Sequence, residues 1–210
     1  MKAGGGSASA TNAAARRHFE AAAAGYTRLR GRGINGWMRR QEQRAVAELA
    51  RLEVGARVLD AGCGDGEILA WATSCGARAF GFDLAAPMAL QCRARGLNVC
   101  VQDMEEVGFR TAFDWVLCIG SLEFTGAPAR AMEELSRSLR RSGRLVLLYP
   151  RRSVLARVYA RYHRRHGVPI RLFDRAQITE LTRGAGLEPR AWRDCLLSSV
   201  CMAEKVRETP

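Results

Sequence analysis

The stretch Val58-Leu59-Asp60-Ala61-Gly62-Cys63-Gly64-Asp65-Gly66-Glu67 decides the fold of this chain. Its apolar start is typical of a buried strand, and its glycines are typical of a tight turn. The next segment, EILAWATSCG at 67–76, has the pattern of a helix. Because glycine lacks a Cβ atom, the turn lets a ligand lie against the main chain, and the helix N-terminus attracts a carboxylate or phosphate. The stretch therefore predicts a ligand site at the carboxyl end of a strand.

The rest of the chain repeats this alternation of strand and helix. A second apolar run, ARAFGFDL at 77–84, completes a β–α–β unit. Further elements are predicted in this order: helix 86–95, strand 98–102, strand 114–119, helix 127–141, strand 143–149, and a terminal hairpin of 189–195 and 197–203. The runs are too apolar for strands with one solvated face. They indicate an α/β fold whose parallel sheet is covered by helices on both faces.

The flanking segments differ in composition from this central part. Residues 1–12 are rich in Gly, Ser and Ala and are predicted to be a disordered tail. Residues 13–52 are predicted to form an N-terminal helical cap, with helices near 13–29 and 37–52. Residues 53–210 would be the main domain, with a helical insert at 150–173 and a later helix from an Asp174 N-cap to a Gly186 stop.

Composition excludes several classes of protein. The 210 residues are 48% hydrophobic and 26% charged, as in a single soluble domain rather than a disordered or fibrous chain. No run of eighteen apolar residues occurs, and the N-terminus lacks the apolar run of a signal peptide, so a cytoplasmic location without a membrane span is expected. The seven cysteines are scattered and form no C-x-x-C pair, so reduced thiols and no metal site are expected.

The net charge of +12 is concentrated at the two ends of the chain. Residues 1–51 carry ten basic and three acidic side chains, residues 52–150 ten and twelve, and residues 151–210 thirteen and six. Seven arginines occupy 151–171, and the next acidic residue is Asp174. Arginine in place of lysine is also the habit of a GC-rich genome, so the run has two interpretations: compositional drift, or a surface patch that faces an anion.

Carboxylates follow the first three predicted strands. Asp83 ends the second strand twenty-one residues after Gly62, where an acidic side chain accepts both hydroxyls of a ribose. Asp103 ends the third strand and is placed to accept from the amine of a base, or else it only caps a loop. With Asp60 these groups favour a cation, and the glycine turn holds no Lys or Arg to receive a pyrophosphate. A cationic, phosphate-free nucleoside such as S-adenosylmethionine fits this pattern.

At this point the chain resembles the class I S-adenosylmethionine-dependent methyltransferases over about residues 54–204. VLDAGCGDGE is similar to the first motif of that family, GFDLAAPM (81–88) to its ribose loop, VQDMEEVGF (101–109) to its adenine loop, and FDWVLCIGSLEF (113–124) to its fourth strand and the following loop. The resemblance implies a Rossmann-like, doubly wound, mostly parallel seven-stranded sheet with an antiparallel last strand. It also implies that the insert at 150–173 is a substrate lid.

The resemblance further implies which residues bind the cofactor. The amino-acid part would be bound by Asp60, Gly62, Cys63, Gly64 and Tyr26, and the ribose by Asp83. The adenine would be bound by Leu84, Met88, Asp103 and the amide of Met104. Gly120 and Ser121 would lie close to the sulfonium.

The acceptor side carries fewer signals. In many relatives the loop after the fourth strand reads Glu-His, whereas this chain has Glu123-Phe124, so the resemblance does not imply a general base at this position. The weak catalytic candidates are the three histidines of the chain: His18, His163 and His166. The candidates for substrate contact are Glu123, Phe124, Tyr149, Tyr159 and Tyr162. Each of these histidines and tyrosines is equally interpreted as a packing or surface residue.

The sequence thus predicts an enzyme that transfers a methyl group from S-adenosylmethionine to an oxygen or nitrogen of a small molecule. The expected acceptor is hydrophobic or aromatic, with or without an acidic group. Two alternatives stay open. The basic ends favour an RNA methyltransferase, and the missing histidine fits a protein that binds S-adenosylmethionine without catalysis. A nicotinamide dehydrogenase is disfavoured because the turn lacks the spacing of the third glycine. Either a monomer or a homodimer is compatible with the sequence.

Overall fold

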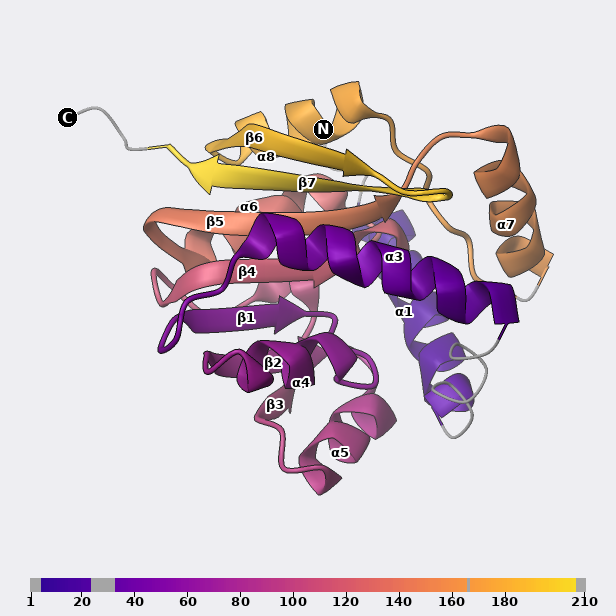
Figure 1. The fold of residues 1–210 in the computed structure, drawn as a ribbon. Coiled ribbons are helices and arrows are strands. Elements are labelled where there is room, and N and C mark those ends of the chain that lie inside the picture. Colours follow the sequence, from indigo (N-terminus) through magenta and orange to yellow (C-terminus); the bar gives the residue numbers. More distant parts are fainter. Residues whose placement is uncertain (1–4, 24–32, 166, 207–210) are drawn as a thin grey trace.

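The computed structural model describes residues 5–23, 33–165 and 167–206, and they form a seven-stranded sheet in the order β3-β2-β1-β4-β5-β7-β6 (Figure 1). Strand β7 is antiparallel to both of its neighbours, and the other adjacent pairs are parallel. The predicted mostly parallel sheet with an antiparallel last strand is therefore confirmed. The strands are β1 (Arg57–Ala61), β2 (Arg78–Asp83), β3 (Val99–Val101), β4 (Phe113–Ile119), β5 (Leu139–Pro150), β6 (Leu187–Asp194) and β7 (Ser198–Lys205).

Helices cover both faces of the sheet. In Figure 1 the helices α3, α4 and α5 lie in front of the sheet and α6 and α8 behind it, whereas α1 and α7 lie at the end where the parallel strands terminate. The α-helices are α1 (Gly5–Ala22), α3 (Gly33–Ala50), α4 (Glu67–Ser74), α5 (Ala86–Ala94), α6 (Pro128–Ser138), α7 (Val154–Arg165) and α8 (Arg175–Gly184). Two 3-10 turns, η2 (Met104–Glu106) and η3 (Leu122–Phe124), follow β3 and β4.

Successive residues of each strand point to opposite faces, and this alternation divides the core into two layers. Val58 packs in one buried cluster with Val46 of α3, whereas Leu59 packs in another with Leu135 of α6. Both layers are fully apolar at their centres, which explains why the strands read as continuous apolar runs.

The N-terminal tail prediction is wrong for residues 5–12, which are helical and belong to α1. The side chain of Asn12 ties this helix to the body of the protein. Its Nδ2 donates to Asp103 Oδ2 at 3.1 Å, and its Oδ1 accepts from the Gly126 N–H at 2.8 Å. These hydrogen bonds offset the conformational entropy lost when the segment becomes helical, and the Gly, Ser and Ala composition of the segment does not indicate them. Residues 1–4 lie outside the described part of the chain.

The boundary between α6 and β5 also differs from the prediction. The sequence predicts a helix to residue 141, whereas α6 ends at Ser138 and β5 begins at Leu139. Leu139 is fully buried and pairs with Phe113 of β4, and the pairing is irregular between Phe113 and Trp115. Burial of Leu139 in the sheet core thus overrides the helical pattern of the following arginines.

Helix α8 begins and ends as predicted. The Asp174 carboxylate accepts from the Gln177 N–H at 2.9 Å, and the Gln177 side chain accepts from the Asp174 N–H at 3.1 Å, which is a capping box. Gly186 follows the helix with a φ of 73°, a left-handed conformation that favours glycine.

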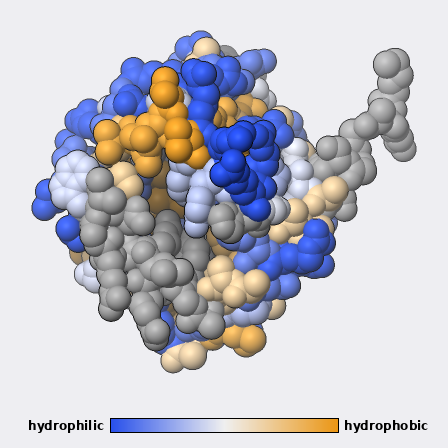
Figure 2. Space-filling view, turned by 90° about the vertical axis from the view of Figure 1, so that its right-hand side faces the viewer, coloured by the Kyte–Doolittle hydropathy of each residue, from blue (hydrophilic) through white to orange (hydrophobic). Residues whose placement is uncertain are grey.

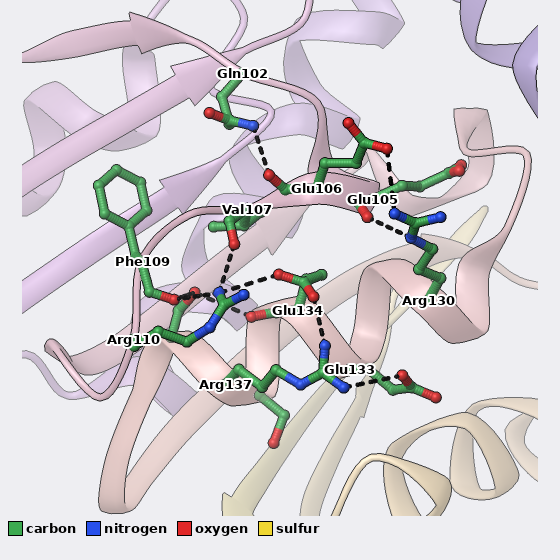
Figure 3. A network of polar contacts seen from close by, with 12 residues as sticks. Gln102, Glu105, Glu106, Val107, Phe109, Arg110, Arg130, Glu133, Glu134 and Arg137 are labelled. Carbon is green, nitrogen blue, oxygen red and sulfur yellow. Dashed lines mark hydrogen bonds and ion pairs between the residues drawn. The ribbon is translucent and has the colours of Figure 1, made fainter.

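A polar network fixes the loop after β3 against α6 (Figure 3). The buried Glu105 carboxylate accepts from the Ala127 N–H at 2.8 Å, at the start of α6, and the Arg130 guanidinium donates to the Glu105 carbonyl at 2.7 Å. Farther along α6, Arg110 donates to Glu134 at 3.1 Å. The network holds η2, and with it the adjacent Asp103, in a defined place at the end of the sheet.

Candidate cofactor and acceptor site

A cleft with an empty volume of about 1120 Å³, open to solvent, lies at the carboxyl ends of the parallel strands. Helices α1 and α3 supply its remaining walls. Eleven of the residues that the sequence predicts for the site line it: Asp60, Gly62, Cys63, Gly64, Asp83, Leu84, Asp103, Met104, Gly120, Ser121 and Phe124. The structure therefore brings together the ends of the first four strands in a single cavity.

The glycine turn is held by main-chain hydrogen bonds. The N–H groups of Gly62 and Cys63 both donate to the Phe82 carbonyl at 2.9 Å. Gly62 has a φ of 74°, and a Cβ atom there would lie 2.5 Å from Ser121 Cβ. Ser121 Oγ donates in turn to the Ala61 carbonyl at 2.7 Å. Gly62 is thus required for the close approach of the loop after β4, in addition to the predicted open face toward a ligand.

Asp83 connects the turn to the end of β2. Its Oδ2 accepts from the Gly64 N–H at 2.8 Å and its Oδ1 from the Ala85 N–H at 2.9 Å. Burial raises the pKa of the Asp83 carboxyl, and the backbone N–H groups oppose this rise. A carboxylate has about four lone-pair sites, so Asp83 retains capacity to accept a ligand hydroxyl while it holds the turn.

Asp60 is the most unusual group in the cleft. It is 2% exposed, and its Oδ2 has no hydrogen-bond partner among the described residues. Burial, and next the nearby charge of Asp83, raise the pKa of the Asp60 carboxyl to about 8. A buried and unpartnered carboxylate oxygen in a ligand cleft is satisfied when a cationic hydrogen-bond donor binds beside it. This chemistry fits an ammonium group.

At the far end of the cleft, Asp103 has protein partners of its own. Its Oδ1 accepts from the Glu105 N–H at 2.9 Å and caps η2, and its Oδ2 accepts from Asn12. The loop-capping interpretation is therefore confirmed, and a role toward a base stays a prediction. Met88, predicted to flank an adenine, does not line the cleft: it is fully buried beside Ala85 and Phe19.

Residues 59–147 match the methyltransferase domain family. A ubiquinone biosynthesis O-methyltransferase of Xanthomonas oryzae pv. oryzae is 34% identical over 107 residues, which is 47% of this chain and 45% of that relative, so the match spans about half of the relative's length. Residues 59–147 are therefore a methyltransferase domain by sequence match. The motifs that carry the match are those at the strand ends described above.

Two solved structures share the fold of this methyltransferase. The magnesium protoporphyrin IX methyltransferase of Synechocystis with bound S-adenosylhomocysteine has a TM-score of 0.77 at 19% identity, over 91% of this chain and 98% of that one. The 1,6-didemethyltoxoflavin-N1-methyltransferase of Burkholderia thailandensis has a TM-score of 0.74 at 20% identity, over 99% and 94%. At these identities the likeness shows a common Rossmann-like fold.

The methyltransferase cleft also has walls that sequence reasoning missed. Asn12, Arg16 and Phe19 of α1 line it, as do Arg39 and Glu42 of α3. The three residues of α1 recur at intervals of three and four, the spacing of one helix face, and this signal could have identified them once the tail was recognised as helical.

Arg39 balances the acidic charge of the glycine turn. Its guanidinium pairs with Asp65 at 3.6 Å and also with Glu67. Asp65 and Glu67 are thereby partly neutralised by α3, whereas Asp60 is not. The cleft therefore keeps one buried carboxylate for a ligand cation.

Rings from three elements lie beside this site. Phe19 of α1 packs on Phe124 with centroids 5.0 Å apart, and both line the cleft. His18 is 6.3 Å from His163 of α7, which also contacts Tyr159 at 4.4 Å. Neither histidine lines the cleft. Two of the predicted catalytic candidates, His18 and His163, thus lie together, and His18 is separated from the cleft by the ring of Phe19, 5.2 Å away.

The remaining predicted acceptor residues occupy varied places. Tyr162 is 5.5 Å from His163 on α7 and does not line the cleft. Glu123 is buried beneath it, with Oε1 3.7 Å from where a Cβ of Gly120 would lie. Predicted residues Tyr26 and His166 lie outside the described part of the chain.

Tyr149 is a correction to the predicted acceptor site. It is fully buried against Phe173 and Trp192, with ring centroids 6.2 and 6.5 Å away, and does not line the cleft. The cause is the pleat of β5: Leu148 points into the layer with α3 and lines the cleft, so Tyr149 must point to the opposite layer.

Two absences apply to the described residues. None of the helices resolved there has the length and apolar character to cross a bilayer. No group of three or more His, Cys, Asp or Glu side chains within residues 5–23, 33–165 and 167–206 is arranged to hold a metal ion.

Proposed function

We propose that this methyltransferase transfers a methyl group from S-adenosylmethionine to an oxygen or nitrogen of a small, hydrophobic or aromatic acceptor. The observation that carries the proposal is the buried Asp60 carboxylate, whose Oδ2 has no partner among the described residues, in a cleft that Phe19 and Phe124 also line. When bound, S-adenosylmethionine supplies a methyl group already activated on a sulfonium.

The acidic strand ends would hold the cofactor along the sheet edge. Asp60 would bind the ammonium, since no described residue satisfies its Oδ2. Asp83 would accept the ribose hydroxyls through its free lone pairs. Asp103 would face the adenine, and the loop of Gly120 and Ser121 would lie nearest the reacting carbon. The tied glycine turn supports a preorganised site, because it needs no rearrangement before binding.

The acceptor would lie between this loop and the ring wall of α1. Apolar rings exclude water and orient a flat molecule, and orientation of two reactants alone contributes roughly 7–11 kcal/mol to lowering a barrier. For an acceptor that must lose a proton, such as a phenol, the candidate bases would be His18, which lies 5.2 Å from Phe19 of this wall, and His163 beside it. An amine acceptor would need no such base.

Two relatives inform the acceptor atom. The protein named for ubiquinone biosynthesis is an O-methyltransferase, and the one named for didemethyltoxoflavin is an N1-methyltransferase. Proteins similar to this chain are thus named for methyl transfer to oxygen and to nitrogen. The names favour small molecules over polymers, which agrees with a cleft of small-molecule size. Such an enzyme would act in the cytoplasm.

The proposal is tested by binding and turnover together. Calorimetric titration with S-adenosylhomocysteine should show binding that Asp60→Asn weakens. Isotopically labelled S-adenosylmethionine, offered with a panel of phenols, amines, catechols and carboxylates, should give methylated product from a small molecule. If the label appears in RNA and in none of the small molecules, the protein is an RNA methyltransferase. If the cofactor binds tightly but neither RNA nor any member of the panel is methylated, the protein binds S-adenosylmethionine without catalysis.

A further inference from the structure

Helix α7 exposes an apolar surface that the described residues, 5–23, 33–165 and 167–206, leave uncovered. Val154 is 75% exposed, Val158 63% and Tyr162 59%, and the neighbouring Leu155 and Tyr159 are 49% and 40% exposed. Ala156 is the one buried residue that α7 contributes among its described positions. Figure 2 faces the side of the molecule where α7 lies and shows hydrophobic side chains gathered there beside hydrophilic ones. Single exposed apolar residues are ordinary, but five on one short helix are not.

These five residues form one continuous stripe, hereafter the α7 stripe. At about 100° per residue, Val154, Leu155, Val158, Tyr159 and Tyr162 fall within an arc of roughly 140°. Ala156 and the half-buried His163 lie next to that arc and face the body of the protein. The stripe is therefore a lateral surface of the helix that points to solvent and not into the cleft.

Arg157, Arg161 and Arg164 flank the stripe on its other side, whereas Arg165 falls within its arc at the last position of the helix. The side chains of Arg157, Arg161, Arg164 and Arg165 are exposed, and none of them forms an ion pair with a described residue. Several arginines on other helices are paired, such as Arg137 with Glu134 at 2.6 Å and Arg183 with Glu188 at 2.8 Å. Helix α7 thus combines an apolar stripe with four positive charges that have no counterion within the described chain.

We propose that α7 is a docking helix for the surface of an anionic lipid bilayer. An amphipathic helix with this pattern lies in the interfacial plane, with its apolar stripe among the upper acyl chains and its arginines at the headgroup phosphates. The charge pattern alone would also suit RNA, but RNA phosphates offer nothing to cover Val154, Leu155 and Val158. A lipid surface satisfies both halves of the helix.

The position of α7 suggests why such docking would be useful. His163 contacts His18 of α1, and the next residue, Phe19, lines the cleft. Docking would therefore hold the cleft close to the bilayer and supply a hydrophobic acceptor from it. That consequence rests on the proposed function, whereas docking itself rests only on the surface of α7.

The test is sedimentation of the full-length protein with vesicles, one set of phosphatidylcholine alone and one with an equal part of phosphatidylglycerol. We expect binding to the anionic vesicles only. Arg157→Gln/Arg161→Gln/Arg164→Gln should weaken binding about 100-fold, since each basic residue at a bilayer surface contributes roughly fivefold. Val154→Ser/Val158→Ser should weaken it at least about tenfold, because both halves of the helix are required.

Matched controls come from exposed positions on other helices. Leu90→Ser on α5 removes a side chain that is 61% exposed, and Arg40→Gln/Arg44→Gln on α3 removes exposed charge. Both should leave vesicle binding within twofold, and all variants should keep the parent affinity for S-adenosylhomocysteine. An unchanged affinity for S-adenosylhomocysteine shows that the variants fold. If the parent protein does not bind S-adenosylhomocysteine, the proposed function is wrong, but the result of the vesicle experiment still stands.

Three results would overturn the docking proposal. The first is no sedimentation with anionic vesicles. The second is an equal loss of binding in the control variants, which would indicate adsorption driven by net charge. The third is tight binding of an RNA duplex that depends on the α7 arginines while the Val154→Ser/Val158→Ser variant still sediments like the parent.

Discussion

The two sides of the cleft are built by different kinds of interaction. On the side proposed for the cofactor, hereafter the cofactor side, hydrogen bonds join three strand ends, as between the Gly64 N–H and the Asp83 carboxylate at 2.8 Å and between the Ser121 hydroxyl and the Ala61 carbonyl at 2.7 Å. On the side proposed for the acceptor, hereafter the acceptor side, rings pack on one another, as Phe19 does on Phe124 at 5.0 Å and His18 on His163 at 6.3 Å, and Asn12 adds one hydrogen bond to the loop after β4.

This difference has a physical consequence for how each side tolerates change. A hydrogen bond to a charged group is lost completely when one partner is removed, whereas ring pairs contribute about 0.5–1.5 kcal/mol and accept many substitutes. The cofactor side therefore demands particular residues, and the acceptor side is free to vary.

The largest effect is expected at Asp83. Asp83→Ala removes two charge-assisted hydrogen bonds that hold the glycine turn, together with the group proposed for the ribose. We expect the affinity for S-adenosylhomocysteine, measured by calorimetric titration, to fall by roughly 100-fold or more, which corresponds to about 3 kcal/mol.

Asp174→Ala is the matched control for Asp83→Ala. It also removes a carboxylate that accepts a backbone N–H, but at the N-terminus of α8, remote from the cleft. It should lower the free energy of unfolding by about 1 kcal/mol and leave cofactor affinity unchanged. Equal losses of affinity in the two variants would show that Asp83 has no special role in the site.

The next effect tests how tightly the two loops of the cofactor side are packed. Gly62→Ala places a Cβ 2.5 Å from Ser121 Cβ, whereas Gly96→Ala, at a nearly identical φ of 77°, meets nothing within 4 Å. Both variants carry the cost of a left-handed alanine, about 1–2 kcal/mol. Gly62→Ala should lose about 2 kcal/mol more in chemical denaturation because of the clash. Equal destabilisation would mean that the loops are able to separate freely.

A smaller effect is expected from the ionisation of Asp60. Its pKa of about 8 in the folded protein exceeds the ordinary value of about 3.9, so the folded state binds the proton more tightly than the unfolded state. Its contribution to stability is therefore fully present below about pH 4 and is lost as the pH rises to about 8. Denaturation curves at several pH values should show this fall, and Asp60→Asn should reduce it.

The same ionisation links pH to ligand binding. An ammonium beside Asp60 favours the carboxylate, so binding of S-adenosylmethionine should release a proton below about pH 8, and affinity should rise with pH by up to roughly tenfold per unit. Calorimetry in buffers of different ionisation enthalpy measures that proton. No release in the parent, or the same release in Asp60→Asn, would place the ammonium elsewhere.

The cofactor side could be predicted well from the sequence because its signals are local. Asp60 near the end of the first strand, Gly62 and Gly64 of the turn, and Asp83 at the end of the next strand lie within one β–α–β unit, and all four line the cleft. Asp60 and Asp83 were identified for this reason. Met88 was misplaced because one position of a helix faces the ligand or the core depending on packing that a sequence does not display.

The acceptor side could not be predicted to the same degree because its contacts are long-range. Asn12 and Phe19 meet the body of the protein at Asp103, Gly126 and Phe124, about a hundred residues away in the chain, and nothing near them in sequence encodes that contact. Tyr149 failed for a simpler reason. Whether its side chain enters the cleft depends on the pleat of β5, and a one-residue change of register exchanges it with Leu148.

The smallest expected effect concerns the contact of His18 with His163, which joins α1 to α7. Because neither side chain lines the cleft, His163→Ala should raise the KM for the acceptor about threefold, the value of one ring pair, and leave the affinity for S-adenosylhomocysteine unchanged. His18→Ala should do the same, and the double variant should cost no more than either single one, since both remove one contact. A loss of kcat beyond about 100-fold, with a pH profile that flattens in one single variant, would instead identify that histidine as a general base. The acceptor side would then depend on one specific residue, as the cofactor side does.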